Sequence, residues 1–169
     1  FCLVGEKGKK GTYNLKQKQL DARFKKERNE DSHTAKRIKE YDESKIKLMI
    51  EMIKRLISRK IHFDYILADS WFACAEVIRF VTSRHIKCHY LGMIKMGKTK
   101  YHYNRKDYTA KALVALFDHP KKGRKFSRNL GCYYVTVDVE FAGRKVRLFF
   151  TKRNKKSEWN ALITTNTEL

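Results

Sequence analysis

The chain has 169 residues, of which 39 are Lys or Arg and 18 are Asp or Glu, so its formal net charge is +21. With 42% hydrophobic residues, 12% aromatic residues and one Pro, it can bury a core of ordinary domain size, which excludes a disordered basic tail. Because so large an excess of positive charge repels itself in a compact fold, we expect a polyanionic partner. Nucleic acid is favoured over an anionic membrane, since no apolar stretch is long enough to span a bilayer and no signal-peptide pattern opens the chain.

Cysteines and histidines form no metal-binding pattern. Cys2, Cys74, Cys88 and Cys132 include no C-x-x-C pair, and the 6 histidines are equally scattered. This spacing excludes a zinc finger and gives no sign of a secreted disulfide framework, so we expect reduced thiols.

The first 40 residues are expected to contribute little to a hydrophobic core. Residues 1–4 predict the end of a strand, and the glycines within 5–8 predict a turn. Residues 9–40 are mostly charged and polar, which predicts an exposed, partly helical segment that either contacts DNA or is only solvated. The chain begins at Phe1 without a Met and stops directly after an apolar run, so we expect a fragment cut within ordered structure at both ends.

Residues 42–60 predict an amphipathic helix. Asp42 and Glu43 stand at its start and Arg59 and Lys60 at its end, as the helix dipole favours. Apolar residues recur at helical spacing and should form a core face rather than a functional one. These residues are Ile46, Met49, Ile50, Ile53, Leu56 and Ile57.

Residues 65–72 carry the most informative pattern, an apolar run that ends on Asp69. Such a run predicts a strand buried on both faces, and residues 71–84 follow it with helical spacing. An acid at the carboxyl end of a central strand lies on the rim of the sheet, where ligands and metals bind in open α/β folds. An unpaired buried carboxylate costs roughly several kcal/mol, so a partner or a metal is expected there. The local pattern fits equally well with Asp69 or Ser70 capping the next helix.

Residues 87–96 predict a second buried strand, through Tyr90, Leu91, Met93 and Ile94. Strand, helix and strand in this order predict a right-handed parallel βαβ unit. An antiparallel insertion should follow within the same α/β domain. Its expected elements are a hairpin over 101–108, a helix from Thr109 to about Phe117, a basic loop over 119–125, and strands over 131–141, 145–151 and 159–165.

Several segments, taken in order, resemble bacterial insertion-sequence transposases of the DDE class. The segments are residues 5–8, 65–72, 93–101 and 159–169, so the resemblance covers nearly the whole chain. It implies an α/β fold with an RNase H-like core, a central mixed or parallel sheet, and a partial catalytic domain over 1–169 with a β-rich insertion over 97–158. This domain would be incomplete at both ends.

The resemblance also implies a metal-dependent phosphoryl transfer that cleaves and joins DNA strands. The family uses two aspartates and a glutamate, and Asp69 matches the second aspartate as catalytic residue and metal ligand. The other two would lie upstream of Phe1 and downstream of Leu169, while Glu168 matches a segment before the glutamate helix and is not assigned that role. The cofactor implied is Mg²⁺, or Mn²⁺ in its place, as a pair of ions about 3.5–4 Å apart. The fragment alone should therefore be inactive.

Several basic and aromatic residues are candidates for DNA contacts. Lys95, Lys98 and Lys100 come after the second strand, on the rim that carries Asp69 if the two strands are parallel. Phosphate contacts are favoured there over a merely solvated loop. Trp71 either packs or stacks on an unpaired base, and Phe72 is expected to pack in the core. Arg124 and Lys125 fit phosphate contact and solvation about equally. The implied partners are transposon ends and target DNA, and no membrane contact is implied. The parent protein would dimerise on DNA, in the bacterial cytoplasm near the nucleoid.

Two other classes of function fit the sequence. One is a basic nucleic-acid-binding domain without chemistry, and the other is a different RNase H-like nuclease such as a resolvase. The first differs from a transposase in lacking the remaining carboxylates in the parent gene. The second would not need the similarities over 93–101 and 159–169.

Overall fold

The computed structural model describes residues 22, 25, 27, 29–36 and 43–169. The chain forms two compact units, residues 1–61 and 62–169. The predicted strand over 1–4, the turn over 5–8 and much of the charged segment over 9–40 lie outside the described residues. Within the described part, no helix is both long and apolar enough to cross a bilayer.

Helix α3 of the first unit spans Lys45–Ser58, inside the predicted 42–60. Ser44 caps it, because its hydroxyl oxygen accepts a hydrogen bond from the Lys47 amide at 3.1 Å. The helix buries Leu48, Ile50 and Ile53. The predicted core face is therefore wrong in part: Leu56 is 38% exposed, and the buried Leu48 was not among the expected residues.

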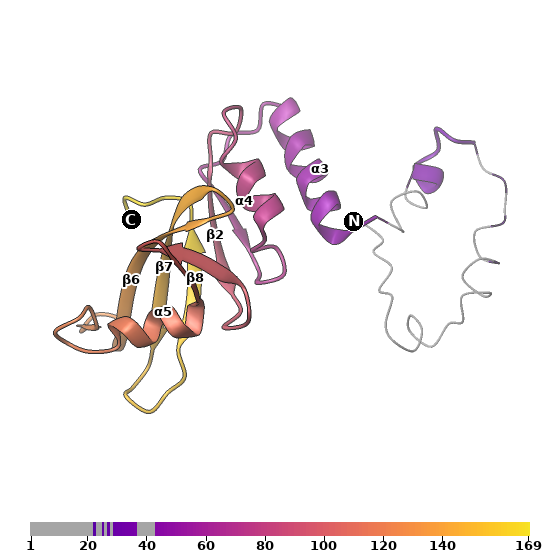
Figure 1. Cartoon of the computed structure of the whole chain (residues 1–169). Coiled ribbons are helices and arrows are strands. Elements are labelled where there is room, and N and C mark those ends of the chain that lie inside the picture. Colours follow the sequence, from indigo (N-terminus) through magenta and orange to yellow (C-terminus); the bar gives the residue numbers. More distant parts are fainter. Residues whose placement is uncertain (1–21, 23–24, 26, 28, 37–42) are drawn as a thin grey trace. The chain divides into compact units, whose positions relative to one another are not determined.

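The second unit is built on one mixed sheet (Figure 1). The strand order is β1-β2-β8-β7-β6-β3-β4, and β5 pairs with β6. The β1–β2 pair is parallel, and the other pairs are antiparallel. The fold is thus mixed α/β, with a parallel pair and an antiparallel part in the same sheet, as predicted. The strands are β1 Tyr65–Ala68, β2 His89–Ile94, β3 Lys100–Tyr103, β4 Lys106–Thr109, β5 Lys125–Ser127, β6 Cys132–Phe141, β7 Arg144–Lys152 and β8 Asn160–Thr164.

One face of this sheet forms the core. Helix α4, Ala75–Val81, packs against β2 and buries Val77, Ile78 and Val81 completely or nearly so. Strand β6 alternates as predicted, with inward-facing valines that are at most 5% exposed. The other large buried side chains include Tyr90, Tyr101, Leu148, Phe150 and Ile163.

The opposite face of β1 and β2 is open in the second unit. Leu67 is 73% exposed and Met93 is 50% exposed. The prediction that these strands are buried on both faces is therefore wrong. A continuous apolar run indicates a strand, but it does not say whether a second layer covers it, and Leu67 and Met93 point away from the face that packs against α4.

The predicted hairpin and helix follow β2. Strands β3 and β4 pair with each other, and β3 joins the sheet where His102 lies opposite Glu140 of β6. Helix α5, Ala110–Phe117, begins at Thr109, whose hydroxyl oxygen accepts from the Ala112 amide at 3.2 Å. The hairpin, the cap and the helix were all predicted correctly.

Candidate functional site

Asp69 directly follows β1, at the carboxyl end of that strand. Strand β1 runs parallel to β2 with Ala68 opposite Gly92, so Lys95, which follows β2, leaves the sheet at the same end. Strand β7 also ends here, and β8 and β6 begin here, because Thr151 pairs with Asn160 and Tyr133 with Lys152. We call this end of the sheet the carboxyl rim.

The position of β1 within the sheet differs from the prediction. Among the described strands β1 lies at the edge of the sheet, and β2 is its described neighbour. A metal-binding acid was expected on a central strand, where two neighbouring strands would supply further side chains. The edge position removes one of those neighbours, so it counts against a complete metal site built from described residues alone.

The chain turns sharply after Asp69. The Asp69 carbonyl accepts a hydrogen bond from the Phe72 amide at 3.0 Å, and its carboxylate accepts one from the Ser70 amide. Helix α4 begins only at Ala75, and its N-cap is Cys74, which makes no side-chain capping bond. The alternative in which Asp69 or Ser70 caps this helix is therefore wrong. Asp69 is exposed, so its second carboxylate oxygen can reach a ligand at the rim.

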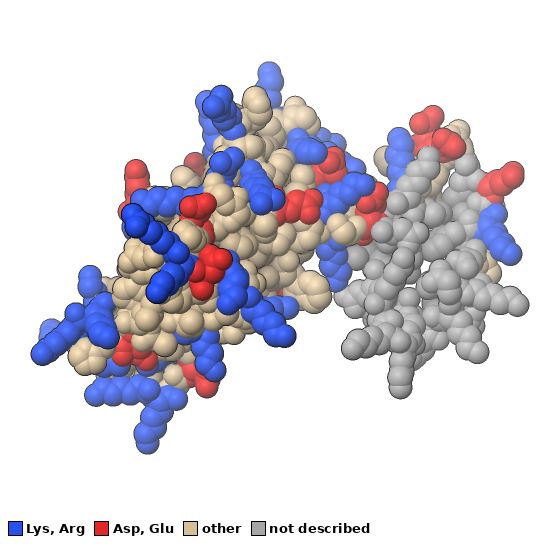
Figure 2. Space-filling view, viewed as in Figure 1, with Lys and Arg blue, Asp and Glu red and all other residues tan. Residues whose placement is uncertain are grey.

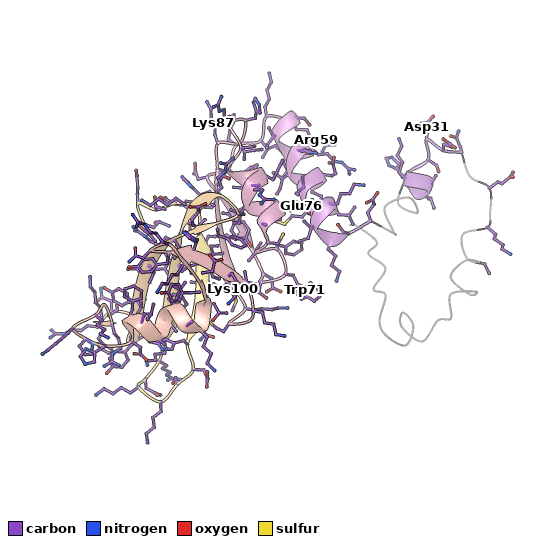
Figure 3. The ribbon with its side chains drawn as sticks, viewed as in Figure 1. Asp31, Arg59, Trp71, Glu76, Lys87 and Lys100 are labelled. Carbon is purple, nitrogen blue, oxygen red and sulfur yellow. The ribbon has the colours of Figure 1, made fainter. Side chains whose placement is uncertain are left out.

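Trp71 and Lys95 meet beside Asp69. The Lys95 ammonium lies 4.5 Å from the centroid of the Trp71 ring, a cation–π contact between the β1–α4 connection and the end of β2. Trp71 is 65% exposed and lies at the surface in Figure 3. Its exposed ring leaves area for a further stacking partner, whereas Phe72 is half-buried.

The other two predicted lysines lie farther along the chain. Lys98 is in the connection over 95–99, and Lys100 opens β3, which pairs with β6 and not with β2. All three lysines are exposed. The connection can span at most about 20 Å. By strand register, only Lys95 is placed at the carboxyl rim next to Asp69.

Behind Asp69, the packing of β2 depends on Gly92. A Cβ atom at position 92 would lie 2.4 Å from the Tyr90 hydroxyl oxygen and 2.7 Å from the Ala68 carbonyl oxygen. The Tyr90 hydroxyl is buried and has no hydrogen-bond partner among the described residues. Burial raises the pKa of this phenol well above its ordinary value, and the nearby Cys74 and Asp69 raise it further. Sequence reasoning missed this pair, although a glycine inside a strand signals a close approach.

Arg124 and Lys125 have different surroundings. The Arg124 guanidinium lies 2.9 Å from a carboxylate oxygen of Asp118 and 5.4 Å from the centroid of the Tyr133 ring. Its side chain is only 17% exposed, so internal contacts occupy it and favour a structural role. Lys125, the first residue of β5, is exposed.

The described residues do not fit a two-metal centre on their own. They contain no group of three or more His, Cys, Asp or Glu side chains that could hold a metal ion. Asp69 could supply one oxygen ligand, and Mg²⁺ commonly combines one or two carboxylates with waters and substrate phosphates. A pair of ions needs further carboxylates.

A separate groove of about 510 Å³ lies between the β3–β4 hairpin and the β6–β7 turn. Asp138 in its wall is already bound by Arg147, with N–O distances of 2.6 and 3.0 Å. The hydrogen bonds from Arg147 hold the pKa of Asp138 below its ordinary value. The other residues that line this groove are His102, Tyr103, Asn104, Val139, Glu140, Gly143 and Lys145.

Comparison with known proteins gives one distant structural likeness to report. No protein-family model matches the chain, and no curated protein matches it. The chain is similar to a solved structure described as the cryo-EM structure of piggyBac transposase synaptic complex with hairpin DNA, with a TM-score of 0.42 and 16% sequence identity. The match covers 76% of this chain and 22% of that chain.

Proposed function

We propose that this chain is part of a DDE-class DNA transposase and that Asp69 is one of the carboxylates of its metal-dependent catalytic centre. In this proposal the reaction is cleavage and joining of DNA strands, and the described residues supply one ligand together with the scaffold that holds it. The remaining acidic ligands are not among the described residues.

The observation that carries the proposal is the arrangement of Asp69, Trp71 and Lys95. An exposed carboxylate, an exposed indole and an ammonium leave two neighbouring parallel strands at the same rim. Carboxyl ends of parallel strands are where open α/β sheets bind ligands. A nucleic-acid strand presents phosphates that Lys95 can contact and base faces on which Trp71 can stack. The sequence resemblance over 65–72 and 93–101 supports the same assignment.

A second candidate function is DNA binding without chemistry. The edge position of β1 among the described strands favours it. The net charge supports both candidate functions equally, because +21 favours a polyanion whether or not the protein cuts it. The two proposals differ in the role of the Asp69 carboxylate.

An Asp69→Asn substitution in the protein encoded by the whole reading frame tests this role. We expect loss of Mg²⁺-dependent strand cleavage with nearly unchanged affinity for DNA, because Asn keeps the size of the side chain but loses the charge that holds a metal. Gel assays of cleavage and fluorescence anisotropy of labelled duplex measure the two properties. Loss of binding with retained cleavage would contradict the assignment.

Asp64→Asn is the matched control. Asp64 is an exposed aspartate just before β1, at the opposite end of the same strand, and the substitution removes the same charge. It should leave both cleavage and binding unchanged. Purified 1–169 chain should bind DNA but show no Mg²⁺-dependent nicking, and robust nicking that Asp69→Asn abolishes would show that the other ligands lie within this chain.

A further inference from the structure

Two exposed basic loops flank the strands that meet the carboxyl rim. The first basic loop, residues 119–128, includes the short strand β5 and precedes β6. The second basic loop, residues 153–158, joins β7 to β8. Figure 2 shows Lys and Arg side chains projecting from this lower end of the second unit. Glu158 is an exposed acid in the second loop. The exposed basic residues are Lys121, Lys122, Lys125, Arg128, Arg153, Lys155 and Lys156.

Asp118 holds the bases of both loops together. One of its carboxylate oxygens accepts from Arg124 at 2.9 Å, which ties the middle of the first loop to the residue that precedes it. The other oxygen accepts from Lys152 at 2.9 Å and from the Trp159 indole nitrogen at 3.1 Å, at the two ends of the second loop. One carboxylate thus joins Arg124, in the middle of the first loop, to the residues at both ends of the second loop.

This clamp is partly shielded from water, and the Asp118 side chain is 27% exposed. The Lys152 side chain is 5% exposed, and its ammonium also lies 4.3 Å from the centroid of the Trp159 ring. Burial raises the pKa of Asp118, but hydrogen bonds from Lys152, Arg124 and Trp159 outweigh it and lower the pKa overall. Each charge in the clamp is therefore paired, as a shielded charge must be.

The exposed cations on the loops are not paired in this way. None of their side chains makes an ion pair or a hydrogen bond with a residue that the structure describes. The second loop nevertheless has a defined shape, because the Asn154 side-chain oxygen accepts from the amides of Lys156 and Ser157, both at 2.9 Å. Unpaired like charges on an ordered support attract a polyanion, because its binding offsets their repulsion.

The loops also lie at the same end of the sheet as Asp69. Strand β7 ends and β8 begins at the carboxyl rim, and three strand spacings separate β1 from β7. At about 4.8 Å a spacing, the second basic loop starts roughly 15 Å along the rim from Asp69. A duplex carries one phosphate charge per about 1.7 Å of axis, so one bound duplex can reach both places.

We propose that the two basic loops, clamped by Asp118, form one phosphate-binding surface for the backbone of duplex DNA. This inference rests on the proposed function, because it takes the DNA of that function as its ligand. It adds the second basic loop and the clamp, neither of which the sequence motifs indicated. Asp118 acts through the loops and is a positioning residue.

The loop surface is tested with the triple variant Arg153→Gln/Lys155→Gln/Lys156→Gln in the 1–169 chain. We expect the slope of log K against log salt for a labelled duplex to fall in magnitude by about 2–3, since each lost phosphate contact removes roughly 0.9. The matched control is Arg84→Gln/Lys87→Gln/Lys145→Gln. It removes the same charges from exposed residues at the opposite end of the sheet, where Lys87 is labelled in Figure 3, and should change the slope by less than about 1.

The clamp is tested with Asp118→Asn/Lys152→Met, which removes the half-buried carboxylate and the buried ammonium and keeps every exposed cation of the loops. We expect the slope to fall by at least about 1, because loops that no longer share a base lose simultaneous phosphate contacts. A thermal melt monitored by circular dichroism checks that the variant folds. Asp138→Asn, which breaks an aspartate–arginine pair away from the loops, is the control and should leave the slope unchanged.

Different outcomes separate this inference from the proposed function. Wild-type binding with an unchanged slope in the loop variant overturns the loop surface and leaves the transposase proposal intact. A wild-type chain that shows no salt-dependent duplex binding overturns both. If the loop variant lowers the magnitude of the salt slope for single-stranded RNA but not for duplex DNA, the proposed partner is wrong. If the clamp variant fails to fold, the loop variant alone decides the surface.

Discussion

At the scale of single residues, Tyr90 combines a buried ring, which favours folding, with a buried hydroxyl, which opposes it. Among the described side chains, its hydroxyl is a buried polar atom without a hydrogen-bond partner, and it lies against Gly92. Leaving such a group unpaired costs roughly 1–3 kcal/mol relative to a satisfied one. The ring itself is fully buried and fills the core beneath the carboxyl rim.

We therefore expect Tyr90→Phe to keep or raise the free energy of unfolding, by up to about 1 kcal/mol, because it removes the unpaired hydroxyl and keeps the ring. Urea denaturation followed by tryptophan fluorescence measures this. A clear loss of stability would show that the hydroxyl has a partner, such as a buried water, that holds the region behind Asp69.

Residues differ in how far the sequence could place them. Asp69 was placed at a strand end because an apolar run stops there, a pattern contained within a few residues. Asp118 was not recognised, because its partners Arg124, Lys152 and Trp159 are up to 41 residues away and only the sheet brings them together. The separation of Lys100 from Lys95 was missed because β3 pairs with β6.

At the scale of elements, local sequence patterns predicted whether a segment forms a helix or a strand, but they did not predict which elements lie next to it. Helix α5 was predicted from its Thr109 cap, and β6 from a strict alternation of apolar and polar residues. The edge position of β1 could not be predicted, since an apolar run reports hydrophobicity and not the number of neighbouring strands. For the same reason, the exposure of Leu67 and Met93 was not predicted.

The β1–β2 pair should be sensitive to a single methyl group. Gly92→Ala is expected to lower the free energy of unfolding by about 1–3 kcal/mol, the usual cost of overpacking, because the new Cβ meets Tyr90 and the Ala68 carbonyl. Tyr90→Phe should rescue only part of the loss, since the carbonyl oxygen stays 2.7 Å from the Cβ position. Urea denaturation of the single and double variants measures the coupling.

Gly97→Ala is the control for that experiment. Gly97 follows β2 in the same chain segment, and a Cβ there would meet nothing within 4 Å. The substitution should change stability by less than about 0.5 kcal/mol, as expected for an exposed site. Equal effects at both positions would show that the close approach at Gly92 does not restrict the strand pair.

At the scale of the whole molecule, the charge of +21 sets how DNA binding responds to salt. Phosphate contacts release counterions, so log K should fall steeply as log salt rises. Two exposed groups of cations supply candidate contacts: the lysines after β2 and the two basic loops. Lys95 leaves β2 at the carboxyl rim, where the loops are clamped, whereas Lys98 and Lys100 lead to β3, so one duplex need not touch all three lysines and the loops.

Replacing Lys95, Lys98 and Lys100 together with Ala decides how the first group contributes. If all three contact phosphates, the magnitude of the salt slope should fall by about 2–3, equally for unrelated DNA sequences because phosphates carry no base identity. The single variant Lys95→Ala should account for about 1 of this. Combining the triple with Arg153→Gln/Lys155→Gln/Lys156→Gln should give additive losses if one duplex contacts both groups at once. An unchanged slope in the lysine triple would show that these side chains are only solvated, and the path of the DNA would then run over the basic loops or the charged segment over 9–40.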